Sequence, residues 1–170
     1  MKRISFIMSI LGILTFTSCA QTGTGLKNAH IKRFYFHYDG TIGGDTHNYN
    51  LVVEDQKAIF KLEDFQVIPS DDLEWSTNRE MVDTLDMTLV RELEKLCTKH
   101  EVYKFNGFDK DNPFVTDGEG FSLRIVYDNG KEIEARGMNR FPNGYREFEK
   151  DLEELFRPYC EQLKKKAFKK

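Results

Sequence analysis

Five segments of the chain alternate apolar and polar residues with a period of two, which is typical of half-buried β-strands. In the first of them, Phe34, Phe36 and Tyr38 alternate with Tyr35 and His37. The segments span residues 31–38, 49–54, 58–65, 121–127 and 131–138. Strands that bury one face and follow one another closely along the chain predict an antiparallel meander sheet.

Two other segments carry apolar residues at helical spacing. The first begins between Asn78 and Thr84 and ends near His100, with a capping box at Thr77 and Glu80. Its apolar positions are Val82, Leu85, Leu89, Leu93, Leu96 and Cys97. The second begins after Pro142, with apolar positions Tyr145, Phe148, Leu152, Leu155, Phe156, Tyr159 and Leu163. The sequence therefore predicts an α+β fold: about five antiparallel strands, with the two helices packed on one face of the sheet.

Turn residues join the predicted strands at two places. Glu54 to Lys57 forms a tight turn between the second and third strands. Asn129-Gly130 predicts a hairpin between the fourth and fifth, because these residues tolerate the positive φ angles of primed turns. The stretch between Val102 and Asp117 is expected to be extended and irregular, and Pro158 to kink or shorten the second helix.

The first eighteen residues have the layout of a bacterial export signal. Lys2 and Arg3 precede an apolar run from Ile4 to Phe16, which is too short to span a bilayer as a helix. The small residues before Cys19 resemble the lipobox of bacterial lipoproteins, although Phe16 stands where that box usually has an aliphatic residue. The resemblance implies cleavage before Cys19 and lipidation of that residue. Ordinary secretion, with a soluble protein starting at Gln21, is the alternative.

These features divide the chain into four parts. Residues 1–18 form a lipoprotein signal peptide, residues 19–28 a tether, residues 29–163 a single α+β domain, and residues 164–170 a basic tail. The expected location is the bacterial cell envelope, with the protein attached to the membrane through its lipid. No acidic cluster follows Cys19, and this favours the periplasmic face over the cell surface.

Composition and charge narrow the functional classes. Removing Lys2 and Arg3 leaves 23 basic residues against 28 acidic ones, a net charge of −5. A nucleic-acid-binding protein would carry a basic excess instead. The 14 Phe and 7 Tyr residues argue against intrinsic disorder.

Little in the sequence points to catalysis. The nucleophile motif G-x-S-x-G and the metal-binding spacings H-E-x-x-H and C-x-x-C do not occur. We therefore predict no catalytic residue, no cofactor and no metal site, and the protein is more readily interpreted as a binding module than as an enzyme.

Two features are candidates for binding. Trp75 lies in an acidic stretch, where an amphipathic aromatic residue suits an interface, although a loop aromatic that covers the end of the sheet is the favoured interpretation. The segment 109–119 supplies four carboxylates, from Asp109, Asp111, Asp117 and Glu119. These oxygens suit a hard cation such as calcium, but the spacing fails the EF-hand pattern, and the favoured interpretation is an Asx-rich surface turn.

Two cysteines remain beyond Cys19. Cys97 and Cys160 each lie in a predicted helix, on or beside its apolar stripe. An oxidising envelope permits a disulfide between them, whereas two buried thiols would behave as small hydrophobic residues. The sequence leaves both alternatives open.

One stretch resembles a group of uncharacterised bacterial proteins, many of them Bacteroidetes lipoproteins. The matching motifs are N-G-F-D at residues 106–109, F-x-L at 121–123, Y-x-x-G at 127–130 and G-x-N-x-F-P at 137–142. The resemblance implies an envelope location and a hairpin followed by a helix, and it assigns no catalytic residue.

The preferred hypothesis is a cell-envelope lipoprotein that binds an envelope protein or glycan without catalysis. The alternative is a small envelope hydrolase that uses carboxylates of the segment 109–119.

Overall fold

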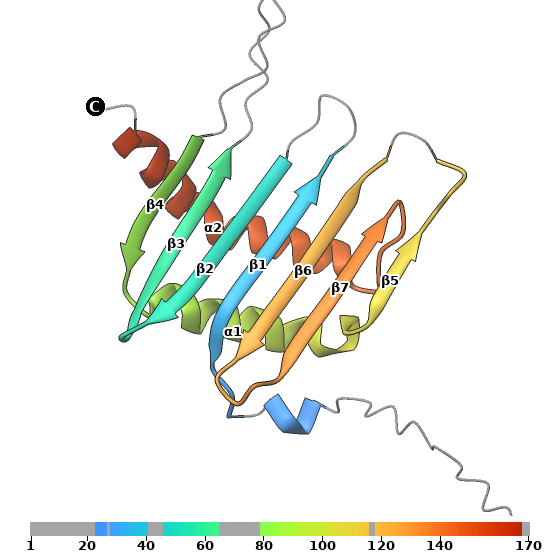
Figure 1. The fold of residues 1–170 in the computed structure, drawn as a ribbon, viewed down its shortest axis with the longest axis horizontal. Coiled ribbons are helices and arrows are strands. Elements are labelled where there is room, and N and C mark those ends of the chain that lie inside the picture. The colour runs from blue at the N-terminus through green and yellow to red at the C-terminus, as the bar shows by residue number, and fades with distance from the viewer. Residues whose placement is uncertain (1–22, 27, 41–45, 65–78, 116–117, 168–170) are drawn as a thin grey trace, which may run out of the picture.

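The fold is seen in a computed structural model, which describes residues 23–26, 28–40, 46–64, 79–115 and 118–167 (Figure 1). These residues form a seven-stranded sheet in the order β4-β3-β2-β1-β6-β7-β5. The strands are β1 Ile31–Asp39, β2 Thr46–Glu54, β3 Lys57–Asp64, β4 Arg79–Leu85, β5 Phe108–Asp111, β6 Gly120–Tyr127 and β7 Glu132–Met138. Every neighbouring pair is antiparallel except β5 and β7, which are parallel.

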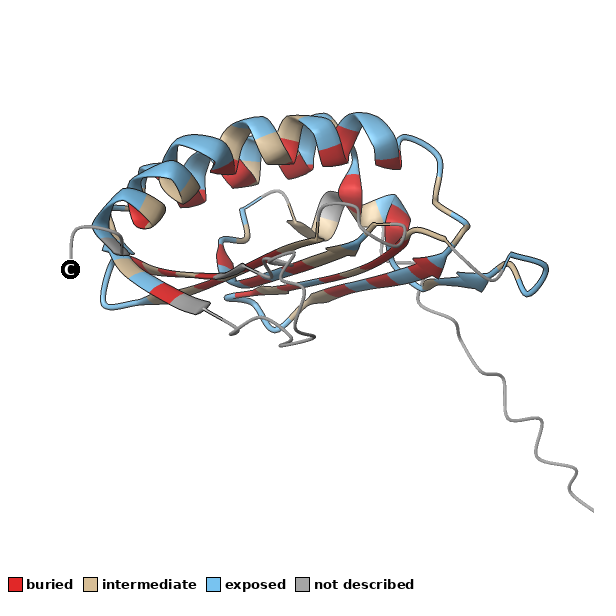
Figure 2. Cartoon of the chain, turned by 90° about the horizontal axis from the view of Figure 1, so that it is seen from above, coloured by how far each residue is buried: buried red, intermediate tan, exposed pale blue. Residues whose placement is uncertain are grey.

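Two α-helices lie on one face of this sheet. They are α1 (Thr88–Lys99) and α2 (Tyr145–Ala167), and two short 3₁₀ helices span Gly23–Leu26 and Val102–Phe105. Figure 2 shows both α-helices on the same side of the sheet, with their buried residues turned toward the strands. The α+β class and the two helices on one face are thus confirmed, while the sheet is larger than predicted and is mixed.

Aromatic side chains form the centre of the core between α2 and the sheet. Phe156 of α2 stacks on Tyr49 of β2, with ring centroids 4.5 Å apart, and on Phe60 of β3 at 5.2 Å. Tyr145, at the start of the helix, packs against Phe121 of β6 at 4.3 Å. Complete burial of one large apolar side chain stabilises a fold by about 1.5–3 kcal/mol, so these contacts hold α2 firmly on the sheet.

The two predicted turns are present, with different backbone geometry. Asp55 and Gln56 both have positive φ, at 47° and 60°, as a tight primed turn between β2 and β3 requires. In the β6–β7 hairpin only Gly130 has positive φ, at 78°. The hairpin is therefore confirmed, but Asn129 does not take the conformation expected of it.

The predicted start of the first helix is wrong. Residues 79–85 form strand β4, which pairs with β3 through Leu62 and Met81 and through Ala58 and Leu85. The spacing of Val82, Leu85 and Leu89 mimics a helix by chance, because the edge strand also needs apolar residues. The capping box is consequently wrong too, because Glu80 lies within β4; Thr77 is outside the described residues.

The true start of α1 depends on a different acidic residue. The carboxylate of Asp86 accepts a hydrogen bond from the backbone N–H of Thr88, at 2.7 Å. This local contact satisfies one of the amide groups that a helix leaves unpaired at its first turn.

Two further expectations need correction. The irregular stretch after Val102 contains a short 3₁₀ helix and strand β5. Strand β5 shows no alternating pattern in the sequence, because it is only four residues long and three of these residues are charged. Helix α2 is not shortened by Pro158, which lies inside it on an exposed position.

Candidate functional site

The face of the sheet that the helices leave uncovered contains an open groove of about 1060 Å³. Side chains from β1, β2, β5, β6 and β7 line it. Its polar lining residues are Arg33, Tyr35, Asn50, Glu54, Asp109, Ser122, Arg124, Glu132, Glu134 and Arg136. Strand alternation explains the set, because the neighbours of these residues along each strand point into the core.

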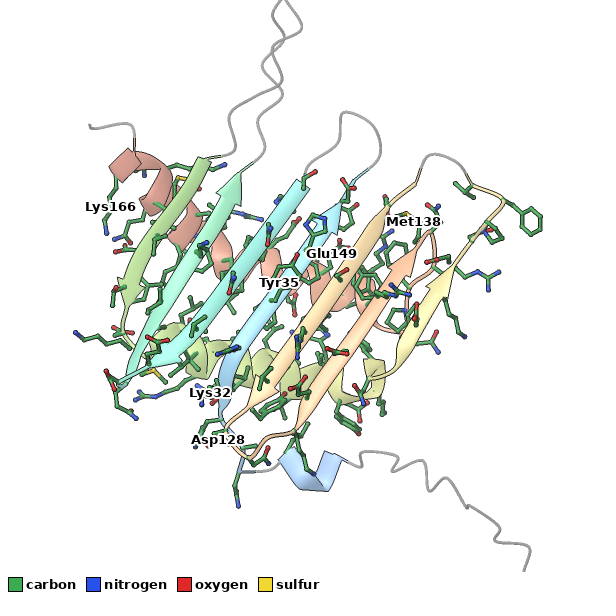
Figure 3. The ribbon with its side chains drawn as sticks, viewed as in Figure 1. Lys32, Tyr35, Asp128, Met138, Glu149 and Lys166 are labelled. Atoms are coloured by element: carbon green, nitrogen blue, oxygen red, sulfur yellow. The ribbon has the colours of Figure 1, made fainter. Side chains whose placement is uncertain are left out.

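Tyr35 lies near the centre of the uncovered face (Figure 3). The pairing of β1 with its two neighbours places Asn50 of β2 on one side of Tyr35 and Arg124 of β6 on the other. The tyrosine is 36% exposed, which leaves part of its surface open to a ligand.

A second row of polar residues crosses the face beside the first. His37 of β1 is paired with Asn48 of β2 and Ser122 of β6. Asn48 is only 9% exposed, an unusual burial for an amide side chain. The Nδ1 atom of His37 is buried and has no hydrogen-bond partner within the described part of the chain. The middle of the face therefore combines neutral hydrogen-bonding side chains with the guanidinium group of Arg124 around an aromatic ring.

Ion pairs occupy the flank of the groove nearest β5. Arg124 pairs with Glu132 at 2.9 Å and with Glu134 at 3.1 Å, and these carboxylates raise the pKa of its guanidinium group. Arg136 donates two hydrogen bonds to Asp109, at 2.7 and 3.0 Å, which lowers the pKa of that carboxyl. Exposed pairs of this kind contribute little to stability, but they hold each side chain in a defined orientation.

The edge strands are poor docking sites in comparison. At one edge, β5 is four residues long and contains Asp109, Lys110 and Asp111. At the other, Asp83 of β4 pairs with Lys166 of α2. Short and charged edge strands discourage the pairing of another strand, so the uncovered face is the larger surface available to a partner.

The structure separates the carboxylates that the sequence grouped together. Asp109 and Asp111 belong to β5, where Asp109 is bound to Arg136. Glu119 lies before β6 and pairs with Arg146 of α2 instead. Asp117 and Trp75 fall outside the described residues. Asp109 is therefore the one predicted binding residue that lines the groove within the described chain.

Arg146 joins Glu119 to a buried carboxylate, Glu149. Its guanidinium group donates to Glu149 at 2.9 Å and stacks on Phe141, 4.1 Å from the ring centre. The hydroxyl of Tyr145 also donates to Glu149, at 3.3 Å. Burial raises the pKa of Glu149, while the contact with Arg146 opposes this effect. Each charge in the cluster has a partner, which is the arrangement expected of a structural contact between α2 and the sheet.

Among the described residues, Cys97 and Cys160 are not bonded to each other. Cys97 is buried on α1, and burial raises the pKa of its thiol to about 12. Such a thiol stays protonated at neutral pH and is a poor nucleophile. His100, one turn further along, bonds to Asp151 of α2 through Nε2 at 2.8 Å.

The described residues show neither a metal-ligand cluster nor a helix suited to crossing a membrane. They contain no group of three or more histidine, cysteine or acidic side chains arranged to hold a metal ion. None of their helices combines the length and the apolar character needed to cross a membrane.

Comparisons with known proteins do not assign the chain to a family. No protein-family model, no curated protein and no solved structure matches the chain.

The polar residues at the middle of the uncovered face were not singled out from the sequence. The relevant signal was present, because Tyr35 and His37 form the polar face of the first predicted strand. The sequence does not show which strands lie beside this first strand. The juxtaposition of Tyr35 with Arg124 depends on β6 pairing with β1, a contact across almost ninety residues of chain.

Proposed function

We propose that this protein is a non-enzymatic binding module of the bacterial cell envelope, that Cys19 carries its lipid anchor, and that it binds a glycan chain on the uncovered face of its sheet. The observation that carries the proposal is the partly exposed ring of Tyr35 between Asn50 and Arg124, with the neutral polar row of Asn48, His37 and Ser122 beside it.

The chemistry of the groove suits a ligand rich in hydroxyl groups. Amide, imidazole and hydroxyl side chains each offer both a donor and an acceptor, as sugar hydroxyls do. Asn50 and Ser122 line the groove and provide such groups on the two strands beside Tyr35. The flat ring can pack against the apolar face of a sugar while its neighbours bond to the hydroxyls.

The balance of charge favours an uncharged ligand. The groove is lined by three arginines and four carboxylates, so its net charge is close to zero. Arg124 and Arg136 are already paired within the face. A strongly charged partner would have to break these pairs, whereas a neutral glycan can bond to them as they stand.

The shape of the groove suits a chain. It crosses from β2 to β5, and neighbouring strands are about 4.8 Å apart, so the five strands span roughly 19 Å. An open groove of this span accommodates several sugar units of a linear polysaccharide.

The alternative hydrolase has no support among the described residues. Asp109 is exposed and its pKa is lowered by Arg136, which is the opposite of what a general acid requires. Glu149 is the described carboxylate with a raised pKa, but it is bonded to Arg146 and Tyr145 within the helix contact.

The lipid anchor is tested by substitution of the cysteine. Cys19→Ser should move the protein from the membrane to the soluble fraction of its bacterial host, and the fatty acyl mass should vanish from the mature protein. Membrane retention of the unlipidated variant would contradict the anchor.

The binding surface is tested by titration calorimetry with chitohexaose, an uncharged glycan chain. The titrated protein consists of residues 21–170, which include every described element. Tyr35→Ala and Asn50→Ala should each weaken binding about tenfold, the effect of losing roughly 1.4 kcal/mol of contact.

Tyr103→Ala is the matched control. It removes the same aromatic side chain from the 3₁₀ helix Val102–Phe105, away from the uncovered face, and should leave glycan affinity unchanged. The proposal would be overturned if Tyr35→Ala and the unsubstituted protein bound chitohexaose with equal affinity. It would also be overturned if the unsubstituted protein did not bind chitohexaose.

A further inference from the structure

A second cavity, of about 540 Å³, lies beside the edge strand β5. Its basic lining residues are Lys104, Lys110 and Arg140, and its aromatic ones are Phe105, Phe108 and Phe141. No carboxylate lines it. In a mature chain with a net charge of −5, a cavity with three cations and no acid is a local reversal of charge. We call it the basic cleft.

Two of the three cations are available to a ligand. Lys104 forms an ion pair with Glu101 at 2.5 Å. Lys110 and Arg140 form no ion pair with any residue in the described ranges. The cleft therefore presents two uncompensated positive charges.

The strand and the turn hold these two side chains in place. Alternation along β5 puts Lys110 on the side of Phe108, with its ammonium nitrogen 5.5 Å from the ring centre, whereas Asp109 points to the other face. Arg140 follows a tight turn in which Asn139 has a φ of 56°. A Cβ atom on Gly137 would lie 2.1 Å from the carbonyl oxygen of Arg140, so this close approach depends on glycine.

We infer that the basic cleft binds the phosphate group of a phosphomonoester, through Arg140 and Lys110. A phosphomonoester carries a charge of about −1.5 to −2 at neutral pH, which two cations neutralise. The guanidinium fork of Arg140 matches two phosphate oxygens, and Lys110 adds a compact positive charge. The aromatic rings lining the cleft provide an apolar contact for the organic part of the molecule.

This site is separate from the proposed glycan groove. The two cavities lie on the two faces of β5 and share the side chain of Phe108. The groove has near-zero net charge and is lined by carboxylates, while the basic cleft has none. Phosphate binding in the cleft consequently does not depend on glycan binding in the groove.

The test measures binding of three probes to residues 21–170. Inorganic phosphate and glycerol phosphate are titrated by calorimetry, and flotation is measured with phosphatidylcholine vesicles that contain or lack phosphatidic acid. Arg140→Gln and Lys110→Gln should each weaken binding about tenfold, because a hydrogen bond to a charged group contributes about 1.5–3 kcal/mol. Added salt should also weaken it.

A variant at an exposed lysine outside the lining of the cleft serves as the control for phosphate binding. Lys95→Gln removes an exposed cation from α1 and should leave binding unchanged. Binding of glycerol phosphate identifies a soluble source of the phosphate group, and binding confined to the phosphatidic acid vesicles identifies a lipid source; either result, lost in Arg140→Gln, supports the inference. The inference is overturned if no probe binds, or if both glutamine variants bind as well as the unsubstituted protein.

Discussion

At the scale of single residues, burial and partners decide what each titratable group can do. Cys97 and Glu149 are both buried, and burial raises the pKa of each. Asp109 is exposed beside Arg136, and its pKa is lowered. Glu149, the described carboxyl group with a raised pKa, is thus not a residue that sequence spacing predicts as functional. Its neighbours along the helix have an ordinary composition.

Glu149 gives a prediction about pH. Its pKa in the folded state is above the ordinary value near 4.5, so the folded state holds this proton more tightly than the unfolded state does. Ionisation of Glu149 therefore costs stability, and the loss develops as the pH rises from that ordinary value through the raised one. In Glu149→Gln this dependence is absent.

Thermal unfolding across pH measures the effect. As the pH falls from 7 toward 4.5, the Tm of the unsubstituted protein should rise relative to that of Glu149→Gln. A domain of this size changes its Tm by roughly 2–4 °C per kcal/mol. Glu147→Gln, an exposed neighbour on the same helix turn, is the control and should track the unsubstituted protein. Parallel Tm curves for the Glu149→Gln and unsubstituted proteins would show that the carboxyl is not tuned by its surroundings.

At the scale of elements, the pattern predicted the buried strands and failed at the edges. Strand β6 alternates without interruption through Phe121, Leu123 and Ile125, and all three are buried as expected. Strand β4 borders only β3, and its apolar residues fit a helix equally well until that pairing is known. Strand β5 is charged, so nothing in its composition marks it as a strand.

The helix α2 illustrates how tertiary contacts outweigh a local signal. Pro158 lacks a backbone N–H and would be expected to end or bend a helix. The helix nevertheless runs to Ala167, because Phe156 and Leu163, on either side of the proline, are both buried against the sheet. Lys166, in its last turn, also pairs with Asp83 of β4.

At the scale of the whole molecule, the two faces of the sheet differ, because helices cover only one of them. The helices and the aromatic core occupy one face, and the other carries a groove that is lined in part by Tyr35, near the centre of the sheet (Figure 3). The N-terminal end of the described chain is fixed at the β6–β7 turn: Asn129 donates to the carbonyl oxygen of Gly25, and Asp128 accepts from the N–H of His30. The described chain thus enters the domain at this end of the sheet.

Mapping backbone amide resonances during titration with chitohexaose tests this account most directly. We expect the largest shift changes in β1, β2 and β6, centred on Tyr35, Asn50 and Arg124, with α1 and α2 unaffected. Changes confined to the helices, or none at saturating glycan, would contradict the assignment of the uncovered sheet face as the binding surface.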